Sequence, residues 1–179
     1  MEEGVSVVIN AIGEEKLTET FKELSKIDKD RISMVVADLD TEEGRNRLVE
    51  SCPEADILIN NNSGPPPTNF LETDKDLWLK ALDSNMLSAI FMIKDLLPGM
   101  KKRKFGRIIN ITSAMVKSPH PLMSLSTSAR TGLTAFSKGI SKDVAKHNVT
   151  INNLLPERFD TDRQVFMTEM LMENQNISR

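Results

Sequence analysis

The residues best placed to do chemistry lie between Gly106 and Gly132, in the stretch GRIINITSAMVKSPHPLMSLSTSARTG. An apolar run there leads to Ser113, and a loop then leads to a helical pattern that begins at Ser126 and carries Arg130 four residues on. A serine hydroxyl can donate a hydrogen bond to a substrate carbonyl, and a guanidinium keeps its positive charge and offers five N–H donors. A strand end, a loop and a helix start in this order are typical of an active-site wall.

Short apolar runs alternate with segments of helical periodicity, and these elements must position the reactive side chains. Apolar runs predict buried strands, and apolar residues that recur every three or four positions predict helices with one buried face. The predicted strands are Val5–Asn10, Ile32–Ala37, Asp56–Asn60, Arg107–Ile111 and Thr150–Leu155. The predicted helices are Glu14–Ile27, Asp40–Ser51, Leu71–Asp83, Asn85–Lys102 and Thr127–Lys146.

The alternation predicts an α/β fold. Strands that are nearly all apolar belong to a parallel sheet covered by helices on both faces. The chain shows no internal repeat and no linker, so we expect one domain over residues 1–179. The polar, methionine-rich tail after Pro156 predicts a helix without a partner. The predicted helix Thr127–Lys146 has one apolar stripe, which fits a core face or a contact between copies: Ala129, Leu133, Phe136, Ile140 and Val144.

Composition excludes several classes of protein. Hydrophobic residues make up 39% and charged residues 27% of the chain, which is typical of a globular protein. The net charge of −3 argues against a nucleic-acid binder, and the basic cluster Lys101–Lys104 follows a predicted helix, whose C-terminus favours cations. No apolar run approaches the ~20 residues of a membrane span, and the N-terminus does not resemble a signal peptide. Cys52 is the sole cysteine, so we expect no internal disulfide and a cytoplasmic location. No metal site is expected.

In this frame the chain resembles the short-chain dehydrogenase/reductase family, whose members use a serine, then a tyrosine, then a lysine four residues on. Ser113 matches the serine, Ser126 the tyrosine and Arg130 the lysine. Asn85 matches the family's helix asparagine, which holds a water and the lysine. The resemblance implies a Rossmann-like sheet and hydride transfer between NAD or NADP and a carbonyl or alcohol. It also implies that these four residues form the catalytic group.

The resemblance implies cofactor contacts as well. Asp38 matches an aspartate that touches the adenine edge, and Asn60 and Asn61 match a turn beside the adenosine ribose. Arg130 is expected to hold a ribose or a phosphate, and Thr161 matches a threonine near the nicotinamide amide. A plain turn is the alternative for the asparagines. The alternative for this segment is a helix cap by Asp40 or Thr41, which would not explain Asp38 itself. The end of the Val5–Asn10 strand shows neither of the residue types that distinguish NAD from NADP.

The position where the resemblance expects a tyrosine as proton donor holds a serine, Ser126. An aliphatic hydroxyl at Ser126 is a far weaker acid than a phenol, and Arg130 keeps its charge but does not share a proton. The sequence contains no tyrosine that could stand in. His120, between two prolines in the same loop, is the one titratable alternative there, and an exposed loop histidine is the competing interpretation.

A glycine-rich phosphate loop is also missing from these residues. No two of the eight glycines are spaced to form one. Set against the family, the fold is therefore incomplete, with the first and last strands absent. Because the family's first strand lies at the centre of the sheet, two strand edges must pair directly, pair with another chain or stay exposed.

The asparagine- and proline-rich segment 60–67 resembles the 3-oxoacyl-acyl-carrier-protein reductase-like branch of the family. The predicted function is NAD(P)-dependent reduction of a small carbonyl or acyl substrate by a degenerate active site. Two alternatives stay open: a non-catalytic binding or oligomerisation protein, and a truncated, inactive gene product. We expect a homo-oligomer formed through the helices that carry Asn85 and Ser126.

Overall fold

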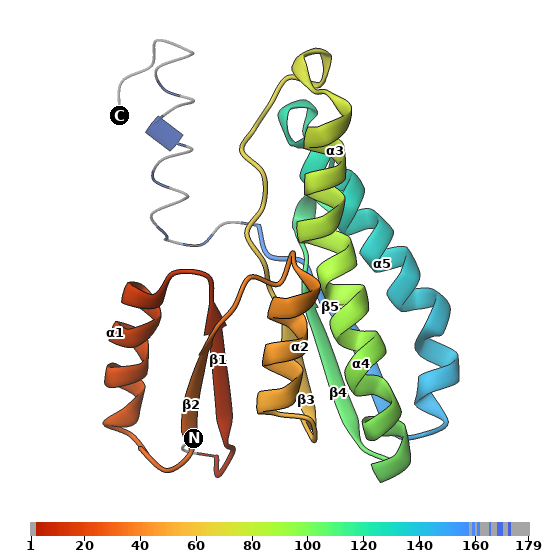
Figure 1. Cartoon of the computed structure of the whole chain (residues 1–179). Coiled ribbons are helices and arrows are strands. Elements are labelled where there is room, and N and C mark those ends of the chain that lie inside the picture. Colours follow the sequence, from red (N-terminus) through yellow and green to blue (C-terminus); the bar gives the residue numbers. More distant parts are fainter. Residues whose placement is uncertain are drawn as a thin grey trace.

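The computed structural model describes residues 3–157 together with 159, 161, 165, 168, 169 and 172. Parallel strands alternate with helices in it (Figure 1). The strands are β1 (Val7–Ala11), β2 (Ile32–Val36), β3 (Ile57–Asn60), β4 (Gly106–Ile111) and β5 (Val149–Leu154). The helices are α1 (Glu14–Ser25), α2 (Glu42–Ser51), α3 (Lys75–Leu82), α4 (Ser88–Arg103) and α5 (Ser124–Ala145). This Rossmann-like α/β order confirms the predicted fold class.

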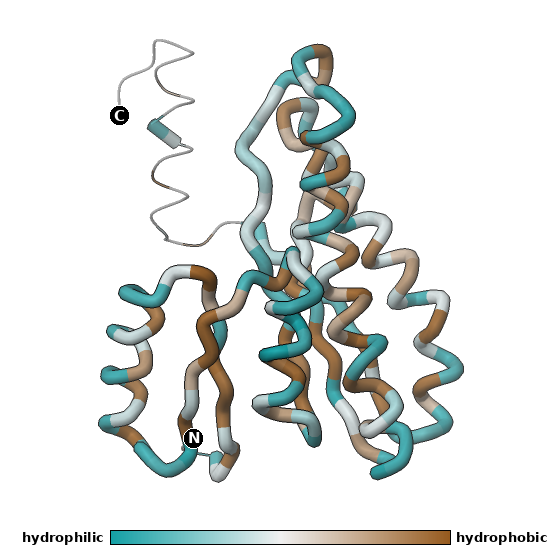
Figure 2. Tube along the Cα trace, viewed as in Figure 1, coloured by the Kyte–Doolittle hydropathy of each residue, from teal (hydrophilic) through white to brown (hydrophobic). Residues whose placement is uncertain are grey.

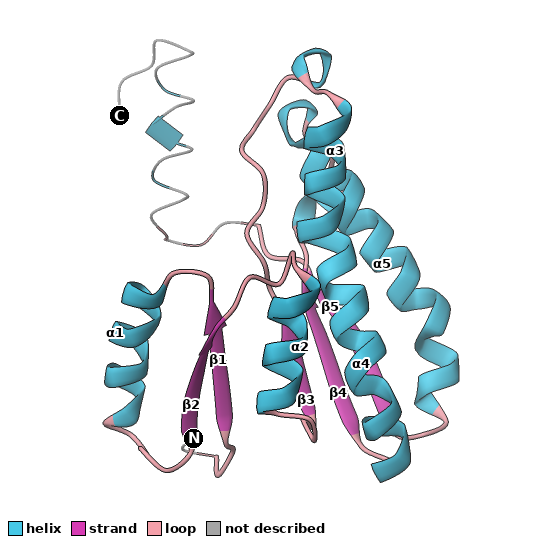
Figure 3. Cartoon of the chain, in the orientation of Figure 1, coloured by secondary structure: helices cyan, strands magenta, loops and turns pink. Residues whose placement is uncertain are grey.

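The strands form two separate parallel sheets, one of β1 and β2 and one of β3, β4 and β5 in that order. Within the described residues no ladder joins β1 to β3. Of the three outcomes expected for the two inner edges, direct pairing of the edges with each other is therefore excluded within the described residues. Figure 3 shows the β1–β2 pair as a body of its own, between α1 and α2.

The main hydrophobic core lies between the three-stranded sheet and helices α4 and α5. Ile108 of β4 and Met100 of α4 are 0% exposed, and Ile93 is 1% exposed. The apolar stripe of α5 belongs to this core or packs against buried neighbours: Ala129, Leu133 and Val144 are buried, and Phe136 and Ile140 are partly buried against the core. Of the two interpretations left open for the stripe, the structure supports the core face.

The opposite face of the same sheet carries exposed apolar side chains. Ile57 and Ile59 of β3 are 45% and 62% exposed, and Leu154 of β5 is 54% exposed, whereas Leu58 between the two isoleucines is buried. Figure 2 shows hydrophobic colour along β3. Among the described residues, helices therefore cover the three-stranded sheet on one face.

The predicted break between the third and fourth helices is not a loop. A turn of π-helix, Asp83–Leu87, joins α3 to α4, so the backbone stays helical there and Asn85 is buried within it. Asp74 caps α3 by accepting a hydrogen bond from the amide of Leu77 at 2.8 Å. The helix predicted in the tail after Pro156 falls largely outside the described residues. No helix among the described residues has the length and apolar character needed to cross a membrane.

Candidate functional site

Ser126, Asn85 and Arg130 lie together and are linked by consecutive hydrogen bonds. Ser126 and Asn85 are buried, at 7% and 5% exposure. The Ser126 hydroxyl donates to Oδ1 of Asn85 at 3.4 Å, and Nε of Arg130 donates to the Ser126 oxygen at 3.1 Å. The spacing of four residues on α5 puts Ser126 and Arg130 on one helix face. The Ser126 proton is thus directed at the asparagine.

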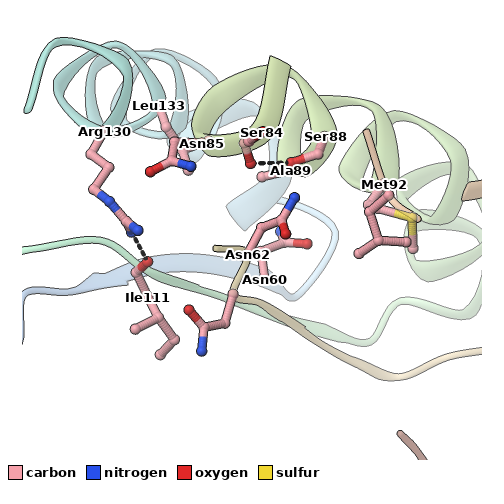
Figure 4. Close-up of a pocket in the computed structure, with 12 residues that line it drawn as sticks. Asn60, Asn62, Ser84, Asn85, Ser88, Ala89, Met92, Ile111, Arg130 and Leu133 are labelled. Carbon is pink, nitrogen blue, oxygen red and sulfur yellow. Dashed lines mark hydrogen bonds between the residues drawn. The ribbon is translucent and has the colours of Figure 1, made fainter. Parts of the chain in front are cut away.

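The rest of the Arg130 side chain ties α5 to the end of β4. Its Nη1 donates to the backbone oxygens of Ile111 at 2.7 Å and Thr112 at 3.0 Å. Figure 4 shows the guanidinium reaching from α5 to the Ile111 carbonyl. On the other side of the chain, Nδ2 of Asn85 donates to the backbone oxygen of Ser63 at 2.7 Å. These contacts join the loop after β3, the π-turn, α5 and the end of β4.

Ser113 lies just beyond β4, close to Arg130's acceptors, but has a different local role. Its Oγ accepts a hydrogen bond from the amide of Met115 at 3.2 Å and so caps a short 3₁₀ turn. In the described part of the chain no hydrogen bond joins it to Ser126. Because the oxygen accepts in this contact, the Ser113 hydroxyl proton is left available as a donor.

Asn60 braces the sheet rather than forming a plain turn. Its Nδ2 donates to Oδ1 of Asn110 at 2.9 Å, and Asn110 in turn donates to Asn153 at 3.1 Å and to Ser137 at 3.0 Å. The parallel register aligns the three asparagines across β3, β4 and β5. Asn110 is 0% exposed, so this ladder satisfies amides that would otherwise be buried without partners.

Beside the ladder, a small amide-rich pocket opens between the end of β3 and α4. Its lining includes Asn60, Asn61, Asn62, Ser84, Asn85 and Arg130. Figure 4 shows Asn60 and Asn62 facing the helix that carries Ser84 and Ser88. Asn61, at its rim, is exposed.

A second polar link crosses from the β2–α2 loop into this pocket. Asp40 accepts a hydrogen bond from the Ser84 hydroxyl at 2.5 Å and one from Nδ2 of Asn62 at 2.9 Å. Asp40 follows the β1–β2 sheet, whereas Ser84 and Asn62 belong to the other sheet's elements. The carboxylate therefore connects the two sheets, which share no ladder.

Asp38 is half-buried at the end of β2, and its Oδ1 accepts from the amide of Asp40 at 3.0 Å. Thr41 supplies the cap of α2 by accepting from the amide of Gly44 at 3.0 Å, as one of the two sequence alternatives had it. The Asp38 carboxylate therefore stabilises a local turn through the Asp40 amide, and Thr41 caps the helix that follows.

The two remaining predicted residues lie outside the buried chain. His120 is exposed, and its Nδ1 accepts from the amide of Leu122 at 3.3 Å, which favours the interpretation as a loop histidine. Thr161 is exposed, and its backbone oxygen accepts from the amide of Val165 at 3.1 Å. Pro156, five residues before Thr161, lies beside the loop after Ser113, because the amide of Ala114 donates to the oxygen of Pro156 at 2.9 Å.

A family model for the short chain dehydrogenases matches residues 1–171. The chain belongs to the short-chain dehydrogenase family. It is 30% identical to the oxidoreductase YvaG of Bacillus subtilis over 178 residues, which is 99% of this chain and 67% of YvaG. It is 36% identical to the 3-oxoacyl-[acyl-carrier-protein] reductase FabG of Haemophilus influenzae over 123 residues, 68% of this chain and 49% of that protein.

Solved structures agree with the family assignment. L-sorbose reductase from Gluconobacter frateurii, complexed with NADPH and L-sorbose, matches 96% of this chain and 67% of its own, with a TM-score of 0.88 and 26% identity. The NADPH-dependent reductase YwfH matches 96% of this chain and 70% of its own, with a TM-score of 0.89 and 28% identity. About a third of each of these relatives has no counterpart among the 179 residues.

Sequence reasoning missed Asp40 as a binding partner of Ser84, and it missed Asn110 as the centre of the ladder. The signal for Asn110 was present, because an amide inside an otherwise apolar strand demands a partner. Nothing in the sequence pairs Asp40 with Ser84, since the two are 44 residues apart and meet only through tertiary structure.

Proposed function

We propose that this chain is an NAD(P)-dependent oxidoreductase of the carbonyl or 3-oxoacyl reductase type whose proton-donor position is degenerate. One observation carries the proposal. The side chain at the tyrosine position is Ser126, which is buried and hydrogen-bonded to Asn85 and Arg130. The serine that would bind the substrate carbonyl, Ser113, is present, whereas the tyrosine that would act as the acid is replaced by Ser126.

A nicotinamide cofactor, when bound, would supply a hydride to the substrate carbonyl, and this chain's residues would have to deliver a proton to the carbonyl oxygen. A phenol with a pKa of ~10, lowered by a neighbouring cation, can supply that proton, whereas an aliphatic hydroxyl is a much weaker acid. The Ser126 proton is also committed to Asn85. Arg130 keeps its charge, and its Nε and Nη1 donate to Ser126 and to the backbone oxygens of Ile111 and Thr112.

The carbonyl-binding part of the proposal rests on Ser113. It accepts from the Met115 amide, so its proton remains free to donate to a carbonyl oxygen. This is the role that an oxyanion-hole donor plays in other enzymes. A small carbonyl or acyl substrate is proposed because the relatives include 3-oxoacyl-[acyl-carrier-protein] reductases and an L-sorbose reductase.

The residues present fit part of a dinucleotide. The pocket at Asn60, Asn61 and Asn62 offers amides that suit ribose hydroxyls, and Asp38 at the β2 end suits an adenine edge. Thr161 is proposed to lie near the nicotinamide amide. The 179 residues hold no glycine-rich loop to take a pyrophosphate, so we derive no step that depends on the cofactor's phosphates. NADPH is the first choice to test, because related structures contain it.

A non-catalytic role is the alternative. It is favoured by the line of hydrogen bonds that joins Ser63, Asn85, Ser126, Arg130 and Thr112, because these bonds can serve only to hold the structure together. In that case the protein acts by binding a partner or by forming a homo-oligomer. In the homo-oligomer, α4, the π-turn and α5 would pack against a second copy of the chain. Light scattering on the purified chain tests the assembly: a dimer supports it, and a monomer at all concentrations rejects it. Location in the cytoplasm is part of either proposal.

The test is a two-stage measurement on the full chain. First, NADPH and NADH are titrated against the protein, and nicotinamide fluorescence reports saturable binding. Second, turnover of a short 3-oxoacyl thioester is compared between the unmodified chain and the double variant Ser126→Tyr/Arg130→Lys. Because a positioned acid contributes ~10²–10⁴-fold, we expect the double variant to be faster by about 10² or more.

The matched control is Ser128→Tyr, which puts a phenol on an exposed position of the same helix and should leave turnover unchanged. Ser113→Ala in the double variant should remove the gained activity. Robust turnover by the unmodified chain, without a gain in the double variant, would contradict the proposal that the proton-donor position is degenerate. Failure of both cofactors to bind would reject the oxidoreductase in favour of the non-catalytic role.

A further inference from the structure

The loop after β3 and the π-turn are held against each other at two successive pairs of residues. In the first pair, the side-chain amide of Asn85 donates to the backbone oxygen of Ser63 at 2.7 Å. The second pair, Asn62 and Ser84, lies one residue earlier on both segments. Both of its members donate to the Asp40 carboxylate, Asn62 to Oδ1 at 2.9 Å and Ser84 to Oδ2 at 2.5 Å. Asp40 therefore bridges the two segments directly beside Asn85.

The Asp40 carboxylate is not needed to begin helix α2. Thr41 caps that helix by accepting a hydrogen bond from the amide of Gly44 at 3.0 Å. Within the described part of the chain, no cation forms an ion pair with Asp40. Because a half-buried carboxylate costs free energy to desolvate, hydrogen bonds must offset that cost. The side-chain donors that do so, Asn62 and Ser84, belong to the two bridged segments.

The π-turn determines which way Asn85 points. The amide of Ser88 donates to the oxygen of Asp83, five residues back, whereas an α-helix bonds four residues back. The turn therefore holds one extra residue, and each residue of a helix advances the side-chain direction by ~100°. A slip to α-helical bonding would rotate one side of the turn by about that angle against the other. Asn85 could then not face Ser126 while α3 and α4 both keep their packing.

Ser84 is the residue through which Asp40 holds this turn. The backbone oxygen of Ser84 accepts from the Ser88 hydroxyl at 2.7 Å, and its own hydroxyl donates to Asp40. Figure 4 shows the bond between Ser84 and Ser88, with Asn85 on the Arg130 side of Ser84. Ser84 is 7% exposed, so loss of Asp40 would leave a buried hydroxyl without its acceptor.

We propose that Asp40 is a positioning residue for Asn85. Its carboxylate bonds the π-turn and the loop after β3 at once, through Ser84 and Asn62, and so keeps the Asn85 amide directed at Ser126. An ionised carboxylate suits this place, because both of its oxygens accept hydrogen bonds and neither donates. The geometric role is independent of catalysis, and an effect on turnover rests on the proposed function.

NMR of the full chain tests the geometric role. Nuclear Overhauser effects from the side-chain amide of Asn85 to Ser63 and Ser126 report its orientation. In Asp40→Ala these contacts should be lost, and the backbone amide of Asn85 should exchange at least about tenfold faster. Ser84→Ala should act in the same direction, and adding it to Asp40→Ala should have little further effect, since both remove the same bond.

Thr41→Ala is the matched control, because it removes a cap from the neighbouring residue of the same loop. It should lower Tm by about 2–4 °C and leave the contacts of Asn85 unchanged. Asp40→Asn keeps one acceptor oxygen and should give an effect between those of the unmodified chain and Asp40→Ala. It applies the same criteria if Asp40→Ala does not fold.

Turnover provides a second readout in the Ser126→Tyr/Arg130→Lys variant. There, adding Asp40→Ala should lower kcat about tenfold or more with little change in the KM for NADPH, because the carboxylate acts through Asn85. Adding Thr41→Ala should leave kcat unchanged. If the double variant shows no turnover at all, the proposed function fails, whereas the NMR measurement still decides the role of Asp40.

Two results would overturn the positioning role. One is an Asn85 side chain that keeps its contacts to Ser63 and Ser126 in Asp40→Ala and in Asp40→Asn. The other is an equal loss of these contacts in Thr41→Ala, which would mean that any loosening of the β2–α2 loop disturbs the turn.

Discussion

The two sheets of this molecule are packed very differently. In the three-stranded sheet, β4 alternates buried and half-buried residues, and Ile108 and Asn110 are 0% exposed. In the two-stranded sheet, every residue of β1 is half-buried, and α1 contributes Leu17 as its buried residue. One half of the molecule has a core closed by α4 and α5, and the other is covered mainly by α1, with a smaller contact from α2.

The residues proposed for catalysis lie on the better packed half. Asn85, Ser126 and Arg130 are fixed there by hydrogen bonds to one another and to the backbone, and Ser113 lies at the end of β4 beside them. Asp38, proposed for the cofactor, lies at the end of the loosely packed half. The geometry of the carbonyl side is therefore rigid, while the cofactor side depends on how well the two halves hold together.

Truncating one strand residue in each half gives the largest contrast. Ile108→Ala should lower the free energy of unfolding by about 3–5 kcal/mol, because it leaves a cavity in a closed core. Ile9→Ala in β1 should cost less than about 1.5 kcal/mol, since its site is half-buried. Urea denaturation measures both. Equal costs would mean that the halves are packed alike.

Gly44 at the start of α2 gives the next largest effect. A Cβ at this position would lie 1.9 Å from the backbone oxygen of Asp38, so Gly44→Ala should cost about 2–4 kcal/mol through displacement of the β2–α2 loop. Gly139→Ala is the matched control, because nothing lies within 4 Å of its added Cβ; in mid-helix it should stabilise by about 0.5–1 kcal/mol. Thermal denaturation distinguishes the two. A harmless Gly44→Ala would show that the loop joining the halves is adjustable.

The smallest effect is expected at the polar link between the halves. Ser84→Ala removes the hydrogen bond to the Asp40 carboxylate and should cost about 1–2 kcal/mol. Its specific signature is faster hydrogen exchange in β1 and β2 with little change in β4. Ser128→Ala, on an exposed face of α5, should change neither quantity. If Ser84→Ala loosens β4 as much as β1, the link does not act between the halves.

Local patterns predicted much of this structure. Strand positions followed from apolar runs, with ends shifted by one or two residues, as in β1 at Val7–Ala11. The α5 stripe and the Thr41 cap followed from helical spacing and capping chemistry. These features depend on residues close in sequence, which is why single-sequence reasoning can reach them.

Contacts between distant residues were beyond that reasoning. The Asn60–Asn110–Asn153 ladder requires the strand register, and the Asp40–Ser84 bond requires the packing of a loop on a π-turn. The single exposed histidine of the loop, His120, also needed the structure to show that its ring nitrogen caps the next turn. The proposed donor position at Ser126 came from the resemblance to the family, whereas its hydrogen bond to Asn85 required the structure.

Native-state hydrogen exchange of the unmodified chain tests the two-part description most directly. The amides of β4 and β5 should exchange only through global unfolding, with free energies equal to that measured by urea. Amides of β1 and β2 should exchange through local opening, at a free energy lower by about 2 kcal/mol or more. A single free energy shared by all five strands would contradict the account, because both sheets would then unfold as one packed unit.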